Sequence, residues 1–357
     1  MDARSRVRMA LNHHEPDRVP LDFGGTFLTS ATAEMQQRLA DLLGFVGSPD
    51  PRFRHFDDRI QRHFGCDLRS ITPTVWPRWG IDWTDLRKTP LATATIADLD
   101  AYPWPEPDDA MVAGLEEEAR FLHRETRFFI CSSQIGQGLF EIGCYLRGYE
   151  RLLLDAGLDT GFIHAFNRKV LDINLRLGDL YFGVVGPYMD MVLVGDDLAT
   201  QRGPYLSPEM FRELYKPYFA EYVAGIRRHC PQAFIAHHCC GSSRLLFDDL
   251  VDIGVQVINP VQTTANGMDA ASLATWKPQL SFLGGVDLQH VLPFGSREEV
   301  DDFVQELIRN LAPGGGYILA PCHSLPNDVK PENVIAMLEA VQRHGTYPIS
   351  ASPAPDG

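Results

Sequence analysis

Two histidines and two cysteines stand side by side at the end of an apolar run, in the segment FIAHHCCGSS at residues 234–243. Imidazole nitrogen and thiolate sulfur are ligands that zinc prefers in proteins, so these residue types indicate metal chemistry. Side chains of a strand point alternately to its two faces, so residues two apart share a face. The possible ligand pairs are therefore His237 with Cys239, or His238 with Cys240. Simple packing of buried cysteines, or a strained disulfide between the two, are the alternatives.

A catalytic zinc is held by three protein ligands and keeps a fourth position open, so a third ligand must come from elsewhere in the chain. Cys322 is the candidate, because it ends a later apolar run, GYILAPCH at residues 316–323. Its neighbour His323 is predicted to support a ligand or to contact substrate. A closed structural zinc site that also recruits Cys239 is the alternative. The remaining cysteines stand in less promising positions, and they are Cys66, Cys131, Cys144 and Cys230.

Short apolar runs that end in polar or glycine-rich turns are typical of buried parallel strands. We find eight of them, at residues 18–25, 66–72, 128–134, 189–197, 233–240, 255–262, 280–287 and 316–323. Helical patterns with start and stop signals stand between or after them. These signals include Ser207 and Ser296 at helix starts and Gly254 and Gly345 at helix ends.

Strands that alternate with helices predict an α/β fold with a parallel sheet, and eight strands predict a (β/α)8 TIM barrel. We expect one barrel domain at residues 1–346, with a lid-like insertion over the barrel mouth at 73–127 and a flexible tail at 347–357. A doubly wound open sheet is the main rival. It would place a glycine-rich turn before a helix, whereas PGGGY at 313–317 precedes a strand.

The chemistry of such a barrel lies at the carboxyl ends of its strands. Polar residues that follow the apolar runs are therefore predicted to bind substrate or to orient a metal ligand, with helix capping as the alternative. The predicted substrate-binding residues are Asp22, Gln134, Tyr188, Asp196, Asp197, Gln262, Asp287 and His323. Of these, Tyr188 and Gln262 are expected to line the walls of the site.

The formal net charge of −15 argues against a nucleic-acid partner, because phosphate contacts need clustered Lys and Arg. No apolar run in the sequence reaches the length of a membrane span, and residues 1–20 lack the apolar core of a signal peptide. Seven scattered cysteines do not match a secreted disulfide framework. We therefore expect a cytoplasmic protein, with a homodimer as a base-rate expectation.

Five stretches follow one another in an order and spacing that together are specific. They are RVRMALNHHEPDRVPLDFGGT, VLVGDDLATQRGPYLSPEMFRELYKPY, HHCCG, FLGGVDLQHVLPFGSREEV and GGGYILAPCHSLPNDVKPENVIAMLEAVQRHG. The chain that they span resembles the uroporphyrinogen decarboxylase superfamily, in its corrinoid-dependent methyltransferase branch. True decarboxylases resemble one another in an Arg-Gln-Ala-Gly-Arg stretch that grips the porphyrinogen carboxylates. This chain has DRVPLDFGGT there, with Arg18 but without the paired arginines, so the resemblance favours the methyltransferase branch.

The methyltransferase branch carries zinc through a His-X-Cys motif and a distant cysteine, which the resemblance places at His238, Cys240 and Cys322. Many relatives have a small or polar residue where this chain has Cys239. The resemblance implies methyl transfer between a small methylated molecule or a thiol and a corrinoid. The corrinoid is expected on a separate small protein, because the chain has no corrinoid-binding Asp-X-His-X-X-Gly stretch. Zinc is expected to keep a thiol ionised or to act as a Lewis acid on the departing heteroatom.

Three alternatives stay open on the sequence alone. A porphyrinogen decarboxylase would be free of metal and would have arginines along its cavity walls. A non-catalytic barrel that binds a corrinoid protein or stores a ligand would keep its function in the variants His238→Ala and Cys322→Ser. A structural zinc site would make the protein unfold when the metal is removed.

Overall fold

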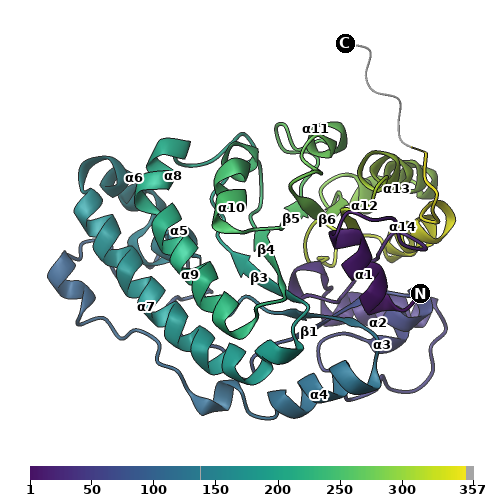
Figure 1. Ribbon diagram of the computed structural model, residues 1–357, viewed down its shortest axis with the longest axis horizontal. Coiled ribbons are helices and arrows are strands. Elements are labelled where there is room, and N and C mark those ends of the chain that lie inside the picture. Colours follow the sequence, from purple (N-terminus) through teal and green to yellow (C-terminus); the bar gives the residue numbers. More distant parts are fainter. Residues whose placement is uncertain (137, 351–357) are drawn as a thin grey trace. The chain divides into compact units, whose positions relative to one another are not determined.

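The computed structural model describes residues 1–136 and 138–350 of the chain, and Figure 1 shows its elements. Its sheet has seven strands, which neighbour one another in chain order. β3 pairs in parallel with β4, and β6 pairs in parallel with both β5 and β7. The order and direction are those of the predicted α/β barrel class. The strands are β1 (Leu68–Ile71), β2 (Phe129–Ser132), β3 (Met191–Gly195), β4 (Phe234–His238), β5 (Val257–Val261), β6 (Ser281–Val286) and β7 (Tyr317–Pro321).

The eighth predicted strand, residues 18–25, forms isolated bridges rather than a strand. Leu21 makes a parallel bridge with Leu319 of β7, and its carbonyl accepts a hydrogen bond from the backbone N–H of Asp67, just before β1. The segment therefore lies between β7 and the start of β1, where an eighth strand is expected. Pro20 has no N–H to donate, so this segment forms fewer ladder hydrogen bonds than a regular strand. The prediction of eight strands is corrected to seven strands and this bridged segment.

Helices separate the strands along the chain, and Figure 1 shows the long helix α7 running beside α9, with which it packs. The helices are α1 (Ala3–Leu11), α2 (Ala33–Leu42), α3 (Asp58–Phe64), α4 (Leu115–Glu125), α5 (Leu139–Arg147), α6 (Tyr149–Leu158), α7 (Thr160–Val185), α8 (Pro208–Leu214), α9 (Lys216–His229), α10 (Phe247–Ile253), α11 (Ala270–Ala274), α12 (Val291–Phe294), α13 (Arg297–Leu311) and α14 (Pro331–His344).

The predicted helix starts and stops agree with the structure. The side chains of Ser207 and Ser296 accept hydrogen bonds from backbone N–H groups in the first turns of α8 and α13, and Gly254 ends α10 in the left-handed conformation at φ 101°. The helical pattern that starts at Ser207 and continues to residue 230 would form one helix, but the structure has two, α8 and α9. Pro217 explains the break, because it cannot donate to the carbonyl of Glu213 four residues earlier.

The chain divides into two compact units. The first contains residues 1–70, 121–131 and the described residues from 256 onward, and it includes β5, β6 and β7. The second contains residues 71–120 and 132–255, and it includes β3, β4 and helices α5 to α10.

The predicted insertion, residues 73–127, contains two short 3₁₀ turns and α4. Part of it is fastened to the second unit by Arg147 of α5. The buried guanidinium of Arg147 pairs with Asp155 at 2.8 Å and also donates to the carbonyl oxygens of Leu91 and Ala94. This buried ion pair with two further hydrogen bonds satisfies most donors of the guanidinium, which is the condition for burying such a charge at tolerable cost.

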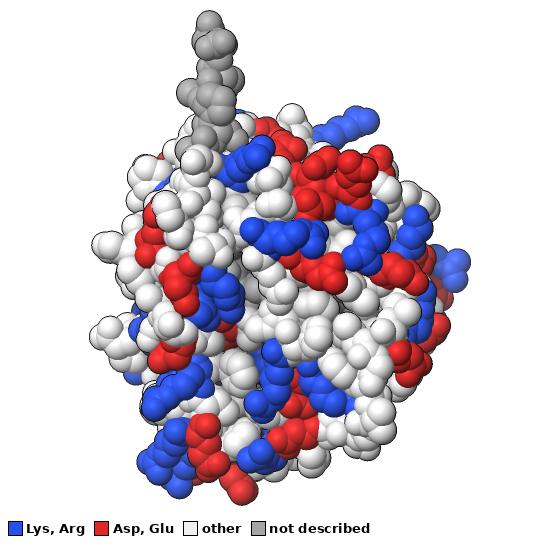
Figure 2. All heavy atoms as spheres, turned by 90° about the vertical axis from the view of Figure 1, so that its right-hand side faces the viewer, with Lys and Arg blue, Asp and Glu red and all other residues white. Residues whose placement is uncertain are grey.

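The surface drawn in Figure 2 carries Lys, Arg, Asp and Glu side chains that intermingle across the face. Opposite charges that alternate in this way form surface ion pairs, of which Arg343 with Asp301 is an example in the first unit. In the part of the chain that the structure describes, no helix has both the length and the apolar character needed to cross a membrane. The end of the predicted tail, residues 351–357, lies outside the described residues.

Candidate metal and substrate site

The carboxyl ends of β3 and β4 place four predicted site residues next to one another. Gly195 and His238 are register partners in the parallel pair, so the residues that follow both strands emerge at one edge of the sheet. Asp196 and Asp197 follow β3, whereas Cys240 comes two residues after the end of β4. The structure thus brings the His-X-Cys motif and the two aspartates together within the second unit.

His238 and Cys240 point their ligand atoms toward one another. The Nε2 atom of His238 lies 3.6 Å from the Sγ atom of Cys240. The imidazole of His238 is 9% exposed, and Cys240 is partly exposed. An imidazole nitrogen and a thiol sulfur so placed form two of the ligands that a zinc site requires.

The alternative pair, His237 and Cys239, is packed in the core. His237 is fully buried against the ring of Phe219, with ring centroids 5.2 Å apart, and neither of its nitrogens has a hydrogen-bond partner among the described residues. Burial lowers the pKa of His237 to about 3 and raises the pKa of Cys239 well above its usual value. The alternation predicted for the strand therefore leaves His238 and Cys240 as the pair whose ligand atoms meet.

Asp197 holds the segment that carries Cys240. Its carboxylate accepts a hydrogen bond from the backbone N–H of Cys240 at 2.8 Å, and the same oxygen lies 3.8 Å from Nε2 of His238. The backbone contact fixes the turn after β4, so Asp197 helps to aim the Cys240 thiol. The Asp197 carboxylate thus lies close to both members of the ligand pair.

Asp196 caps a helix. Its buried carboxylate accepts the backbone N–H groups of Phe140 and Glu141, both at 2.8 Å, in the first turn of α5. Its own N–H donates to the carbonyl of His238, and burial raises the pKa of Asp196 to about 8. Asp196 therefore connects the start of α5 to the His238 segment, and the predicted substrate contact stays a prediction.

Glu141 is a polar group of this region that the sequence patterns did not reveal. Its carboxylate accepts a hydrogen bond from the hydroxyl of Tyr145 at 3.2 Å. Burial, and secondarily the charge of Asp197, raise the pKa of Glu141 to about 7. An acidic residue in the first turn of a helix is ordinary, so its spacing carries no signal of a site. The one sequence feature that could have indicated this contact is the spacing of Glu141 and Tyr145, because residues four apart lie on the same face of a helix.

Two other predicted residues lie at opposite ends of β3. Gln134 follows β2 and covers Gly195, where an added Cβ would lie 2.2 Å from the Gln134 Oε1 atom. Tyr188 precedes β3, at the opposite end of that strand from Asp197, and its hydroxyl lies 3.4 Å from the guanidinium of Arg120. Tyr188 thus lies away from Asp197, and its predicted place in the walls of the site stays a prediction.

The first unit holds the other predicted residues. Cys322 follows β7 and donates its backbone N–H to the carbonyl of Val286. The residue is 6% exposed, and this burial raises the pKa of its thiol to about 12. Asp287 follows β6 and accepts three backbone N–H groups, which closes the turn into α12. Gln262 follows β5, and both Gln262 and His323 are partly exposed. The structure thus places Cys322 at a strand end, as predicted, and assigns Asp287 a capping contact.

Asp22, another predicted substrate residue, is fully buried in a turn. Its carboxylate accepts the N–H of Gly25 at 2.9 Å and the hydroxyl of Thr29 at 2.7 Å. Burial raises the pKa of Asp22 to about 7. The carboxyl shapes the turn after the bridged segment, and its predicted contact with substrate stays a prediction.

We expect Asp22→Asn to gain stability relative to the wild type as the pH rises from about 4 to about 7. The folded state binds the Asp22 proton more tightly than the unfolded chain, whose pKa is about 3.9. This contribution to stability is present at low pH and is lost as the pH rises through the folded-state pKa. Urea unfolding of both proteins across this window measures the difference, and a difference independent of pH would contradict the prediction.

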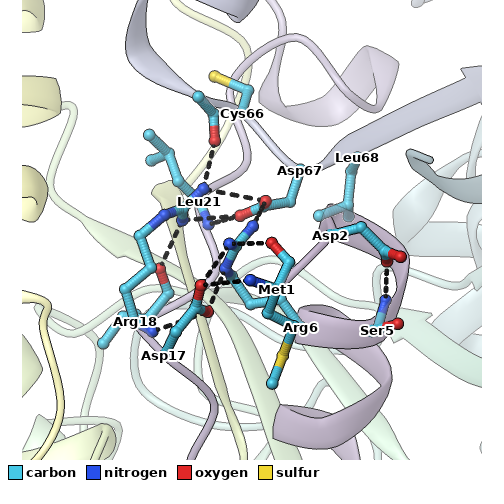
Figure 3. Close-up of polar contacts among 12 residues, drawn as sticks. Met1, Asp2, Ser5, Arg6, Asp17, Arg18, Leu21, Cys66, Asp67 and Leu68 are labelled. Atoms are coloured by element: carbon cyan, nitrogen blue, oxygen red, sulfur yellow. Dashed lines mark hydrogen bonds and ion pairs between the residues drawn. The ribbon is translucent and has the colours of Figure 1, made fainter. Parts of the chain in front are cut away.

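Arg18, the arginine nearest to the position of the decarboxylase motif, is fully engaged inside the first unit. Its guanidinium donates to both carboxylate oxygens of Asp67, at 2.9 and 3.0 Å, and to the carbonyl of Gly65. Figure 3 shows Arg18 and Arg6 converging on Asp67 from two sides. An arginine committed to these partners has few donors left for a porphyrinogen carboxylate.

Residues 135–344, more than half of the chain, match the family model described as uroporphyrinogen decarboxylase (URO-D). The chain therefore belongs to the uroporphyrinogen decarboxylase family. This confirms the superfamily that the sequence stretches indicated.

Among solved structures, a methyltransferase from Methanosarcina mazei is similar over nearly the full length of both chains. The TM-score is 0.65 at 14% sequence identity, and the match covers 96% of this chain and 99% of that chain. At this identity the likeness establishes a shared fold. A glycoside hydrolase matches with a TM-score of 0.48 at 13% identity, covering 90% of this chain and 99% of that chain. No curated protein sequence matches this chain.

Proposed function

We propose that this protein is a zinc-dependent methyltransferase, which moves a methyl group between a small methylated substrate or thiol and a corrinoid carried by a separate protein. The observation that carries the proposal is the meeting of His238 Nε2 and Cys240 Sγ at the end of β4. The shared fold with a protein named as a methyltransferase supports it.

The proposed zinc ligands are His238, Cys240 and Cys322. His323 is the rival for the third position. Its imidazole, like the side chains of His238 and Cys240, offers one atom that can bind a metal, and the three form one candidate group. The donor set is one imidazole with two sulfurs, or two imidazoles with one sulfur if His323 replaces Cys322, and either set fits zinc better than magnesium or calcium, whose ligands are oxygen. Bound there, zinc would supply Lewis acidity that keeps a substrate thiol ionised or polarises the bond to a departing heteroatom.

The residues around the pair would orient and shield it. Asp197 holds the Cys240 backbone at 2.8 Å, and Asp196 ties the His238 carbonyl to the start of α5. Both contacts keep the two ligand atoms near one another before any metal binds. Preorganisation of this kind reduces the ordering that metal and substrate must impose.

A corrinoid-carrying partner needs a surface on which to dock. In residues 73–127, Trp76 and Trp83 are 44% and 63% exposed, whereas Trp79 is buried. Exposed tryptophans are enriched at protein–protein interfaces, so we place the partner's docking surface on this segment. Trp79, in contrast, packs inside the segment and is not available to a partner.

Elemental analysis of purified protein and a methyl-transfer assay test the proposal together. We expect about one zinc per chain, and transfer of the methyl group of methylcobalamin to a small thiol that stops when a chelator removes the metal. The melting temperature should fall only modestly on chelation, because an open catalytic site contributes less to folding than a closed structural one. Metal-free protein that decarboxylates a porphyrinogen would instead establish the decarboxylase alternative.

A further inference from the structure

Aromatic rings lie on and beside α5, the helix of the second unit that carries Glu141. Tyr145 donates its hydroxyl to the Glu141 carboxylate at 3.2 Å, and its ring meets that of Trp83 edge-on, with centroids 5.2 Å apart. Tyr149, at the start of α6, and Tyr205 face one another with centroids 5.9 Å apart. We call Glu141, Tyr145, Tyr149 and Tyr205 the tyrosine cluster.

The tyrosine cluster adjoins the His238–Cys240 pair through Asp196 and Asp197. Asp196 accepts the N–H of Glu141 at 2.8 Å and donates its own N–H to the carbonyl of His238, and the ring of Phe140 packs against that of Tyr205 with centroids 5.2 Å apart. Asp197 follows Asp196 in the chain, and its charge adds to the effect of burial in raising the pKa values of Tyr145, Tyr149 and Tyr205. The same carboxylate accepts the Cys240 N–H at 2.8 Å. A molecule that reaches the metal ligands of the second unit therefore has the tyrosine cluster within its surroundings.

This region holds the carboxylates of Glu141 and Asp197. In the described part of the chain, neither Glu141 nor Asp197 forms an ion pair with a lysine or arginine. The group that comes closest to serving as a counterion is the imidazole of His238, which lies 3.8 Å from the Asp197 carboxylate. Two partly buried carboxylates without a cation are electrostatically costly, and a positive ligand would relieve that cost.

The rings of the cluster are open to a ligand. Tyr149 is 45% exposed and Trp83 is 63% exposed, while Tyr145 and Tyr205 are partly exposed. Aromatic faces attract an organic cation within about 6 Å of the ring centroid, and several rings with a carboxylate are the arrangement that binds quaternary ammonium groups. An anionic ligand would be repelled by Glu141, and a neutral ligand would gain no charge pairing from it.

We infer that the small-molecule substrate of this protein is an organic cation, whose positively charged nitrogen binds between the Glu141 carboxylate and the rings of the tyrosine cluster. The inference rests on the proposed function, since it names the substrate class of the same site. The charged nitrogen is the recognition group. A thiol or ether group elsewhere in the same molecule reaches His238 and Cys240, so Glu141 determines specificity and takes no part in the bond change.

Binding of choline, compared with its uncharged carbon isostere dimethylbutanol, tests the inference by titration calorimetry on both metal-free and zinc-loaded protein. We expect choline to bind at least tenfold more tightly than the isostere, and Glu141→Gln to weaken choline binding by about tenfold or more, as loss of a charged partner does. Glu117→Gln, on the exposed face of α4, is the matched control and should bind choline like the wild type.

Tyr149→Leu is a second variant, chosen because this exposed side chain can be replaced without disturbing the core. It should weaken choline binding severalfold and leave the isostere unaffected, as expected for a lost cation–π contact. Equal binding of choline and its isostere, no choline binding, or wild-type affinity in Glu141→Gln would each overturn the inference. Zinc content and methyl transfer are measured separately. If the protein transfers methyl groups but binds choline and the isostere equally, only the proposed substrate class is refuted. Protein without zinc that still binds choline through Glu141 supports the cation site and refutes the methyltransferase.

Discussion

Replacing Cys240 or Cys322 by serine is expected to remove bound zinc and to abolish methyl transfer. Structural zinc sites with four ligands bind with about 10–16 kcal/mol, so one ligand contributes on average about 3 kcal/mol and its loss weakens the affinity roughly 100- to 1,000-fold. Serine keeps the size of the side chain but offers a poor zinc ligand, so the effect reports coordination rather than packing. Zinc content after dialysis and competition with a chromogenic chelator give the affinity.

Cys239→Ala is the matched control for Cys240→Ser. Cys239 is fully buried and its thiol points to the carbonyl of Cys240 at 3.5 Å, so its replacement should cost stability but leave zinc binding intact. His323→Ala distinguishes the two candidates for the third ligand, because it should keep zinc if Cys322 binds the metal. Loss of zinc in Cys239→Ala with retention in Cys240→Ser would invert the ligand assignment and refute the proposed site.

The fold could be predicted where local patterns and burial agree. Seven of the eight apolar runs are strands, and the predicted caps at Ser207 and Ser296 form. The pattern failed at residues 18–25, whose composition resembles a buried strand although Pro20 interrupts the ladder. It failed again within the helix predicted after Ser207, where Pro217 divides one amphipathic pattern into α8 and α9. In both places a missing backbone N–H prevailed over hydrophobic periodicity.

The site could be predicted only in part, because the relevant contacts join residues far apart in sequence. Alternation along β4 limited the ligand pair to two choices, and burial of His237 then distinguished them. Asp196 caps α5 by accepting N–H groups from residues that are 55 and 56 places earlier in the sequence, and no local pattern encodes a contact over this separation. Glu141 could not be predicted for the same reason. Its position is fixed by the contact of Asp196 with the start of α5, and its electrostatic environment includes the charge of Asp197.

The cluster around Asp67 shows the same limit in the first unit. Its carboxylate is 1% exposed and receives Arg6 at 2.7 Å, Arg18 at 2.9 and 3.0 Å, and the backbone N–H of Leu21 at 2.9 Å. Figure 3 shows these donors converging on one side chain. Asp67 thereby fastens α1 and the bridged segment to the start of β1. One carboxylate thus substitutes for part of the hydrogen-bond ladder that the eighth predicted strand lacks.

Asp67→Asn is therefore expected to destabilise the protein by about 3 kcal/mol, since removing one partner of a buried ion pair leaves the other charge uncompensated. The amide keeps the shape of the side chain but carries no charge, and its nitrogen cannot accept a hydrogen bond from arginine. Glu339→Gln is the control, because the Arg297–Glu339 pair is exposed and such pairs contribute within about 1 kcal/mol. Chemical unfolding of the three proteins measures the free energies of unfolding. Equal, small losses in both variants would mean that the bridged segment is held by its packing and not by Asp67.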